Sequence, residues 1–172
     1  MAVYHISDTH FGHKNIIKFR PGFETLQEHD EYVRDMILDT LHKKDKLVFH
    51  GDLCFHRDAL KYVQEIADQI ESVELILGNH DLESNQRPSI QDLIDIFGKK
   101  IYGMKKYKKV WLTHAPLHPK ELRGGLNIHG HVHSNSINEY GFINSCCEAL
   151  NYRPKEFSKL LEEHLNEFKP RN

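Results

Sequence analysis

Five short blocks of Asp, Asn and His residues are spread along the chain, and their residue types suit metal-dependent hydrolysis. The blocks are Asp8-Thr9-His10, Gly51-Asp52, Gly78-Asn79-His80-Asp81, Thr113-His114 and Gly130-His131-Val132-His133. Together they offer carboxylate, imidazole and amide ligands but no thiolate, a set that suits Mn, Fe, Zn or Ni better than a structural zinc site. The seven candidate ligands are Asp8, His10, Asp52, Asn79, His114, His131 and His133.

Four of the five blocks come directly after a short apolar run, over residues 3–6, 46–49, 73–77 and 110–112. Such runs predict buried strands, and ligand sites in open α/β sheets assemble at the C-terminal ends of strands. We therefore expect the blocks to converge at one edge of a sheet. Any one block would be common by chance, but all of them in this order are hard to explain as packing.

The glycines of three blocks, Gly51, Gly78 and Gly130, are expected where the backbone turns sharply. The spacing of His131 and His133 leaves two arrangements open. An extended segment would place both imidazoles on one face, whereas a turn at Gly130 would direct them toward two different metals.

Composition limits the class of protein. With 172 residues, the chain fits one ordinary domain over 1–172, and a net charge of −2 with charges of mixed sign gives no sign of a long nucleic-acid footprint. A mean hydropathy of −0.60 and the lack of a long apolar stretch or a signal peptide lead us to expect a cytoplasmic protein with no membrane association. Cys54, Cys146 and Cys147 suggest no disulfide framework, and buried inert thiols are expected for the last two.

Strand and helix patterns alternate along the first half of the chain and predict an α/β fold. Helices are expected over residues 25–42 and 58–70, and a third should be capped by Ser89 and stopped by Gly98. Short strands are expected over 99–103, 106–113 and 126–129, followed by a hairpin over 136–145. A last helix should open at Pro154.

The motifs D-x-H, G-D, G-N-H-D, T-H-A-P and G-H-V-H, in this order from Asp8 to His133, resemble those of the calcineurin-like metallophosphoesterase superfamily. The stretch from Ile6 to His13, with Asn15-Ile16-Ile17 and Arg20-Pro21, looks like a small single-domain branch from bacteria and phages. The resemblance implies a four-layer α/β sandwich, in which two mixed β-sheets pack face to face between flanking helices.

The resemblance also implies roles for single residues. Asp8, His10 and His133 would hold one metal, and Asn79, His114 and His131 would hold a second. Asp52 would bridge the pair, which would be divalent transition-metal ions, with manganese favoured. His80 would be the catalytic histidine that binds no metal, and Asp81 could orient it or support its charge.

By this resemblance, a metal-bridging hydroxide would attack a small phosphodiester or phosphomonoester directly, with the diester slightly favoured. The substrate would be nucleotide-like or a nucleic-acid end, and no obligate protein partner is expected. Protein phosphatases and purple acid phosphatases are disfavoured, because Asp81 and Phe55 replace their glutamate and tyrosine. The alternative is an inactive binding module of the same fold, which would have lost His80 or some ligands.

Side chains outside the five blocks also carry expectations. His13, which follows the first block closely, is predicted to bind substrate, with a supporting or capping role as the alternative. Arg20 is predicted to bind substrate because an arginine fork matches phosphate oxygens, with a surface ion pair as the alternative. His5 alternates with apolar residues and is expected to be structural. The lysine-rich stretch 99–109 is expected to be a solvated hairpin and is the one feature that could attract a polyanion.

Overall fold

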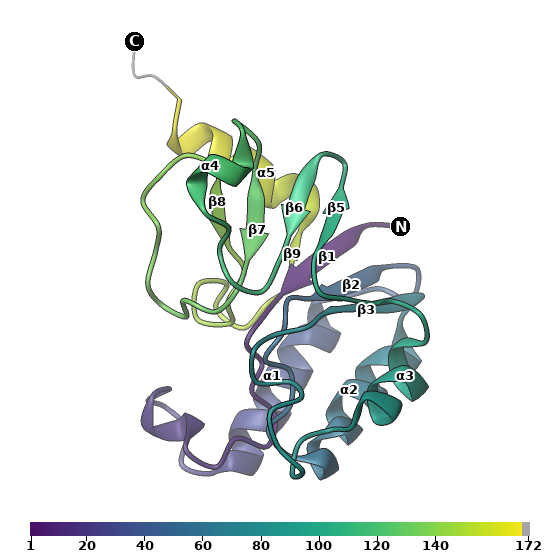
Figure 1. Cartoon of the computed structure of the whole chain (residues 1–172). Helices are drawn as coiled ribbons and strands as arrows, with labels where there is room; N and C mark the ends of the chain where they lie inside the picture. Colours follow the sequence, from purple (N-terminus) through teal and green to yellow (C-terminus); the bar gives the residue numbers. More distant parts are fainter. Residues whose placement is uncertain (170–172) are drawn as a thin grey trace.

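The computed structural model describes residues 1–169 and contains two mixed β-sheets. The five-stranded sheet has the order β4-β3-β2-β1-β9 (Figure 1). Strands β1 to β4 run parallel, and β9 pairs antiparallel with β1 at one edge. Their bounds are β1 Val3–Ile6, β2 Lys46–Phe49, β3 Ser72–Ile76, β4 Ile101–Tyr102 and β9 Lys155–Glu156.

The second sheet has the order β5-β6-β7-β8. Its strand β5 pairs antiparallel with β6, whereas β6, β7 and β8 run parallel to one another. The bounds are β5 Lys105–Tyr107, β6 Val110–Leu112, β7 Asn127–His129 and β8 Phe142–Asn144.

Helices flank both sheets. On the five-stranded sheet these are α1 Leu26–Thr40, α2 Leu60–Gln69 and α3 Ile90–Phe97, and on the other side lie α4 Pro119–Leu122 and α5 Phe157–Glu167. Two short 3₁₀ turns, η1 Ile16–Lys18 and η2 Arg57–Ala59, connect strands to helices. The expected α/β sandwich of two mixed sheets with flanking helices is confirmed.

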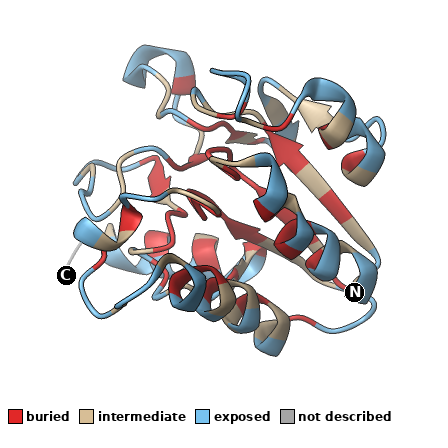
Figure 2. Cartoon of the chain, turned by 90° about the horizontal axis from the view of Figure 1, so that it is seen from below, coloured by how far each residue is buried: buried red, intermediate tan, exposed pale blue. Residues whose placement is uncertain are grey.

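The alternation of side chains along β2 explains this layering. Leu47 and Phe49 point into the core formed with α1, α2 and α3, whereas Val48 belongs to the core between the two sheets. Because successive side chains of a strand point to opposite faces, one apolar run can contribute to both cores. Figure 2 shows the result, with buried residues in the strands and on the inner sides of the helices.

Three expected elements differ in the structure, two of them toward the C-terminus. The hairpin over 136–145 is wrong: within that range only β8 is a strand, and it pairs in parallel with β7 after an irregular loop. Pro154 does not open the last helix, because Lys155 and Glu156 first pair with β1, and α5 begins at Phe157. The helix at Ser89 is confirmed, with a capping box between Ser89 and Asp92 and a positive φ at Gly98.

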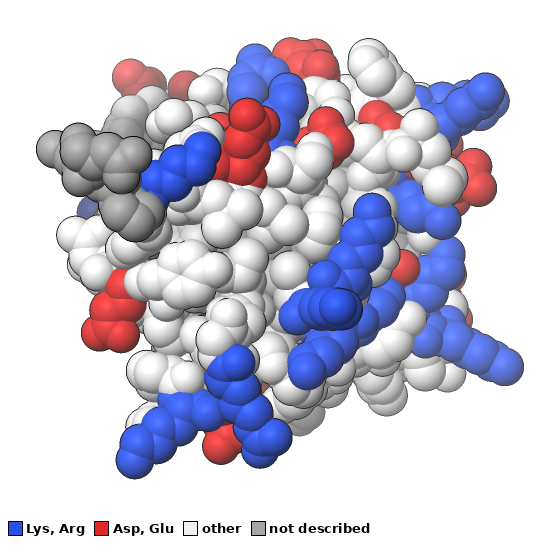
Figure 3. Space-filling model, turned by 90° about the horizontal axis from the view of Figure 1, so that it is seen from above, with Lys and Arg blue, Asp and Glu red and all other residues white. Residues whose placement is uncertain are grey.

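The third difference concerns the lysine-rich stretch: residues 101–102 form β4 in the five-stranded sheet, and a turn at Lys108-Lys109 divides the strand expected over 106–113 into β5 and β6. Only the second half of the stretch therefore belongs to a hairpin, on which Lys106, Lys108 and Lys109 are exposed. Figure 3 looks down on the end of the molecule that carries this hairpin and α5, and shows basic side chains in separate groups between uncharged and acidic areas. Within residues 1–169, no helix has the length and apolar character needed to cross a membrane.

Candidate metal centre

The five sequence blocks meet at one edge of the molecule, because each follows the C-terminal end of a strand. These strands are β1, β2, β3, β6 and β7. Backbone hydrogen bonds join the loops that follow them: the Asp8 N–H donates to the Gly51 carbonyl at 3.0 Å, and the Gly130 N–H donates to the His114 carbonyl at 2.8 Å. Contacts also cross between the sheets, since the His131 N–H donates to Asp8 Oδ2 at 2.9 Å. The two sheets therefore contribute to a single site.

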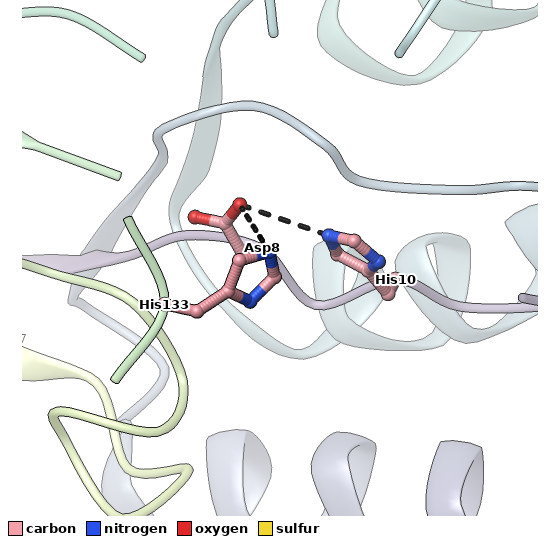
Figure 4. Close-up of side chains that lie close together, drawn as sticks. All are labelled: Asp8, His10 and His133. Atoms are coloured by element: carbon pink, nitrogen blue, oxygen red, sulfur yellow. Dashed lines mark ion pairs between the residues drawn. The ribbon is translucent and has the colours of Figure 1, made fainter. Parts of the chain in front are cut away.

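The first group of candidate ligands consists of Asp8, His10 and His133, which point toward one another in Figure 4. Asp8 Oδ1 lies 3.7 Å from His10 Nε2 and 3.9 Å from His133 Nε2. These distances are too long for hydrogen bonds. They suit ligands of one ion, because ligand atoms about 2.0–2.2 Å from a metal lie roughly 3–4 Å from each other.

The second group consists of Asp52, His114 and His131, with Asn79 beside it. His114 Nε2 lies 3.4 Å from Asp52 Oδ2. Asn79 Oδ1 lies 2.9 Å from His114 Nε2 and 3.0 Å from His131 Nδ1. The structure therefore brings together all four residues that were expected around the second metal.

Asp52 lies between the two groups. The oxygen that faces His114, Oδ2, is also 3.9 Å from His10 Nε2 of the first group. The other oxygen, Oδ1, accepts a hydrogen bond from the His80 backbone N–H at 2.9 Å. One carboxylate can thus reach ligands of both groups, as a bridging residue must.

Two buried polar atoms of the first group have no hydrogen-bond partner among the described residues: Asp8 Oδ1 and His10 Nε2. A buried polar atom without a partner costs about 1–3 kcal/mol, and a cation would satisfy both atoms. Asp8 Oδ2, in contrast, accepts hydrogen bonds from the Ser7 hydroxyl at 2.5 Å and the His131 N–H at 2.9 Å. The residues present therefore fit a divalent metal ion, toward which Asp8 would present Oδ1.

The backbone at the candidate ligands is strained. Left-handed φ values occur at five of them: Asp8 (+57°), His10 (+55°), Asp52 (+50°), His131 (+73°) and His133 (+53°). Such conformations cost on the order of 1–3 kcal/mol each and cluster at functional sites. They also decide between the two arrangements left open for the last block: the segment is not extended, and His131 and His133 join different groups.

The glycines of the blocks have two different roles. Gly51 has a φ of +83°, as a sharp turn requires. Gly78 and Gly130 have no left-handed φ, and close approach of neighbouring atoms requires glycine at both positions. A Cβ on Gly78 would lie 2.3 Å from Asp52 Oδ1, and one on Gly130 would lie 2.5 Å from Asp8 Oδ2. The carboxylates of the site thus fit directly against glycine backbone.

Burial and the charged neighbours of His114 and Asp8 shift the pKa values of these two side chains in opposite directions. Burial would lower the pKa of His114, but the neighbouring Asp52 carboxylate raises it to about 9. Burial would likewise raise the pKa of Asp8, but His10, His114 and the Ser7 hydroxyl hold it well below its usual range. Without metal, the Asp52 carboxylate favours a proton on His114, whereas burial lowers the pKa of His10. A bound cation would take the place of the His114 proton.

The structure corrects the role expected of Asp81. This buried carboxylate accepts backbone hydrogen bonds from Leu53 at 2.7 Å and Gly78 at 2.6 Å, so it joins two site loops. The His80 ring is hydrogen-bonded instead to Glu83, with 2.6 Å between Nδ1 and Oε2. The sequence analysis missed Glu83, although its spacing of three residues from His80 within one loop was a possible signal.

His13 lies beside the first group, with its Nδ1 3.3 Å from His10 Nδ1. Phe55 stacks on both imidazoles, at 4.5 Å from the His10 ring and 4.2 Å from the His13 ring. The Arg87 guanidinium lies 3.4 Å from the centre of the Phe55 ring. Arg87 and Phe55 were both missed as site residues, because neither belongs to a ligand motif.

Arg20 lies beneath the site and is 1% exposed. Its three guanidinium nitrogens contact protein atoms: the carbonyls of Asp8 and Thr9, the ring of His29 and the carboxylate of Glu148. This location does not fit the expectation that Arg20 binds substrate, since burial removes it from the surface that a substrate could reach.

Comparisons with known proteins extend over nearly the whole chain. Residues 1–169 match the family model described as calcineurin-like phosphoesterase. An uncharacterized protein of Methanocaldococcus jannaschii is 32% identical over 177 residues, which cover 94% of this chain and 92% of that protein. The crystal structure of a protein of unknown function from Aquifex aeolicus superposes with a TM-score of 0.71 at 25% identity, covering 94% of this chain and 98% of the other.

Proposed function

This chain belongs to the calcineurin-like phosphoesterase family, and we propose that it is a dinuclear metal-dependent phosphodiesterase acting on a small, nucleotide-like diester. The family supports metal-dependent phosphoester hydrolysis in general. The dinuclear proposal rests chiefly on the position of Asp52, whose Oδ2 faces ligands of both groups at 3.4 Å and 3.9 Å.

The metal ions would activate a water and stabilise negative charge on the phosphoryl oxygens; manganese suits the mixed nitrogen and oxygen ligands. Asp8, His10 and His133 would hold one ion, Asn79, His114 and His131 the other, and Asp52 both. His80 contributes a proton donor, because its ring is partly exposed and Glu83 supports the charged imidazolium through Nδ1. The Nε2 proton of that imidazolium is then available for the leaving oxygen.

Two cavities flank the two ligand groups and favour a diester. One, of about 410 Å³, is lined by His10 and His133 together with Ile16 and Phe19. The other, of about 460 Å³, is lined by His114 and His131 together with apolar residues that include Met104. A phosphate held at the centre would have room for one substituent on each side. A diester has two substituents, whereas a monoester has one.

Phe19 provides the most specific support for an aromatic substituent. Its side chain is 74% exposed at the rim of the first cavity, so it contributes little to the folded core. A flat, exposed ring beside a phosphate site can stack on a nucleobase or another aromatic group. The first cavity would therefore hold the aromatic substituent of the diester.

Phe19→Ala is expected to raise KM for a nucleoside p-nitrophenyl phosphodiester about tenfold, because the variant loses one stacking contact with the nucleobase. The rise in KM should be much smaller for methyl p-nitrophenyl phosphate, which has no nucleobase. Steady-state kinetics with added Mn²⁺ would measure both. Tyr140→Ala, which removes another exposed ring (50% exposed), is the matched control and should behave as wild type. Equal effects of Phe19→Ala on both diesters would contradict the stacking role.

If wild-type enzyme with Mn²⁺ hydrolysed monoesters only, the diester proposal would be wrong, and if it hydrolysed neither class, the binding-module alternative would stand.

A further inference from the structure

A half-buried carboxylate outside the expected ligand set contacts the first ligand group. Glu148 follows β8, and its side chain is 17% exposed. Its Oε1 atom lies 2.9 Å from His133 Nδ1 and 2.9 Å from Arg20 Nε. None of the sequence motifs contains Glu148, and Cys146-Cys147 before it are buried. The carboxylate thus lies between a candidate metal ligand and a buried guanidinium.

The contact with Glu148 determines which nitrogen of His133 can bind a metal. Because an ionised carboxylate only accepts hydrogen bonds, His133 Nδ1 must carry the proton that it donates. In the neutral ring, Nε2 is then the free nitrogen, and Nε2 is the atom that faces Asp8 Oδ1 at 3.9 Å. Carboxylates that orient histidine ligands in this way are a common feature of metal sites.

Arg20 contacts the backbone of the first ligand group. Its Nη2 donates to the Asp8 carbonyl at 2.5 Å, and its Nη1 donates to the Thr9 carbonyl at 3.2 Å. Asp8 is one of the residues with a left-handed backbone. The guanidinium thereby fixes two peptide groups of the strained segment that carries Asp8 and His10. The Tyr152 ring lies 5.5 Å from the guanidinium carbon and covers it.

We propose that the buried Arg20 and the half-buried Glu148 form an ion pair that positions the ligands of the first metal: Asp8 through its carbonyl and His133 through its Nδ1 proton. The proposal rests on the dinuclear centre of the proposed function. It applies to one site only, since in the second group His114 Nδ1 is hydrogen-bonded to the His50 carbonyl at 2.7 Å instead. Arg20 and Glu148 are thus positioning residues.

Glu148→Gln tests the pair with a change of charge but almost none of size. The variant should bind Mn²⁺ or Zn²⁺ about 10–100-fold more weakly at one of its two sites and normally at the other, as measured by calorimetric titration. Glu163→Gln is the matched control, because this carboxylate is 60% exposed on α5 and pairs only with Lys155 among the described residues. Wild-type affinity at both sites in a folded Glu148→Gln protein would overturn the proposal.

Nitrogen NMR of the metal-free, ¹⁵N-histidine-labelled protein provides a readout that a merely structural role would not change. In its neutral form, His133, assigned by comparison with a His133→Gln sample, should carry its proton on Nδ1 in wild type and populate both tautomers in Glu148→Gln. An unchanged tautomer in the variant would also overturn the proposal. If Glu148→Gln fails to fold, Glu148→Ala, which also removes the carboxylate, takes its place in both measurements, and wild-type affinity at both sites would again contradict the proposal.

These readouts separate the positioning pair from the proposed function. A wild-type protein that binds two ions but hydrolyses no phosphoester would contradict the function, and the selective loss at one site would still support the pair.

Discussion

Asp52→Asn is expected to cost metal at both sites and to lower kcat by more than about 10²–10³-fold, the loss usually seen for one electrostatic group. The reason is geometric: Oδ2 faces ligands of both groups, so its charge offsets the repulsion between two cations. A neutral amide cannot provide this. Loss of an outer ligand, as in His131→Ala, should lower metal content and kcat less than Asp52→Asn does, because it affects only one ion.

Metal content by elemental analysis and turnover in added Mn²⁺ would be measured on the same Asp52→Asn preparations. Asp58→Asn is the matched control, because the Asp58 side chain is 90% exposed. An Asp52→Asn protein that keeps two metals and near-normal turnover would show that Asp52 is not the bridge.

His80→Ala is expected to keep both metals and the fold but to lose roughly 10²–10⁴ in kcat, the usual contribution of a proton donor. The loss should be smaller for a p-nitrophenolate leaving group, which departs without help, and larger for a ribose oxygen, which needs the proton. Rates for one activated and one unactivated diester, with metal content measured in parallel, test this.

His42→Ala, which removes an exposed imidazole at the end of α1, should leave both of these rates unchanged. If His80→Ala slows both diesters equally, the main role of His80 is to stabilise charge on the phosphoryl oxygens rather than to supply a proton. If His80→Ala loses metal, His80 is a ligand, and the assignment is wrong.

The scaffold of the site could be predicted from sequence because it depends on local patterns. Short β-branched runs before Asp8, Asp52 and Asn79 gave the three strands, and parallel pairing then brings their ends together. The β8 region was predicted wrongly because a parallel strand requires a crossover, and its partner β7 is identified only by tertiary pairing.

The residues that support the ligands could not be predicted, because their roles depend on contacts between distant segments. Arg20 and Glu148 are separated by 128 residues, and nothing in either neighbourhood indicates the other. An arginine near a phosphate motif suggests substrate binding, and only the burial of the guanidinium beneath Asp8 shows otherwise. Glu83 differs from these, since its contact with His80 is local in sequence. It was missed because Asp81, the residue directly after His80, was predicted to be the partner of the imidazole.

The central claim is a pair of metal sites that share Asp52, and anomalous diffraction from crystals saturated with Mn²⁺ tests it most directly. We expect two peaks roughly 3.5–4 Å apart. One should lie among Asp8, His10, His133 and Asp52, and the other among Asp52, Asn79, His114 and His131. Soaking in a chelator should remove both peaks. A single peak, or none, at saturating Mn²⁺ would contradict the dinuclear centre.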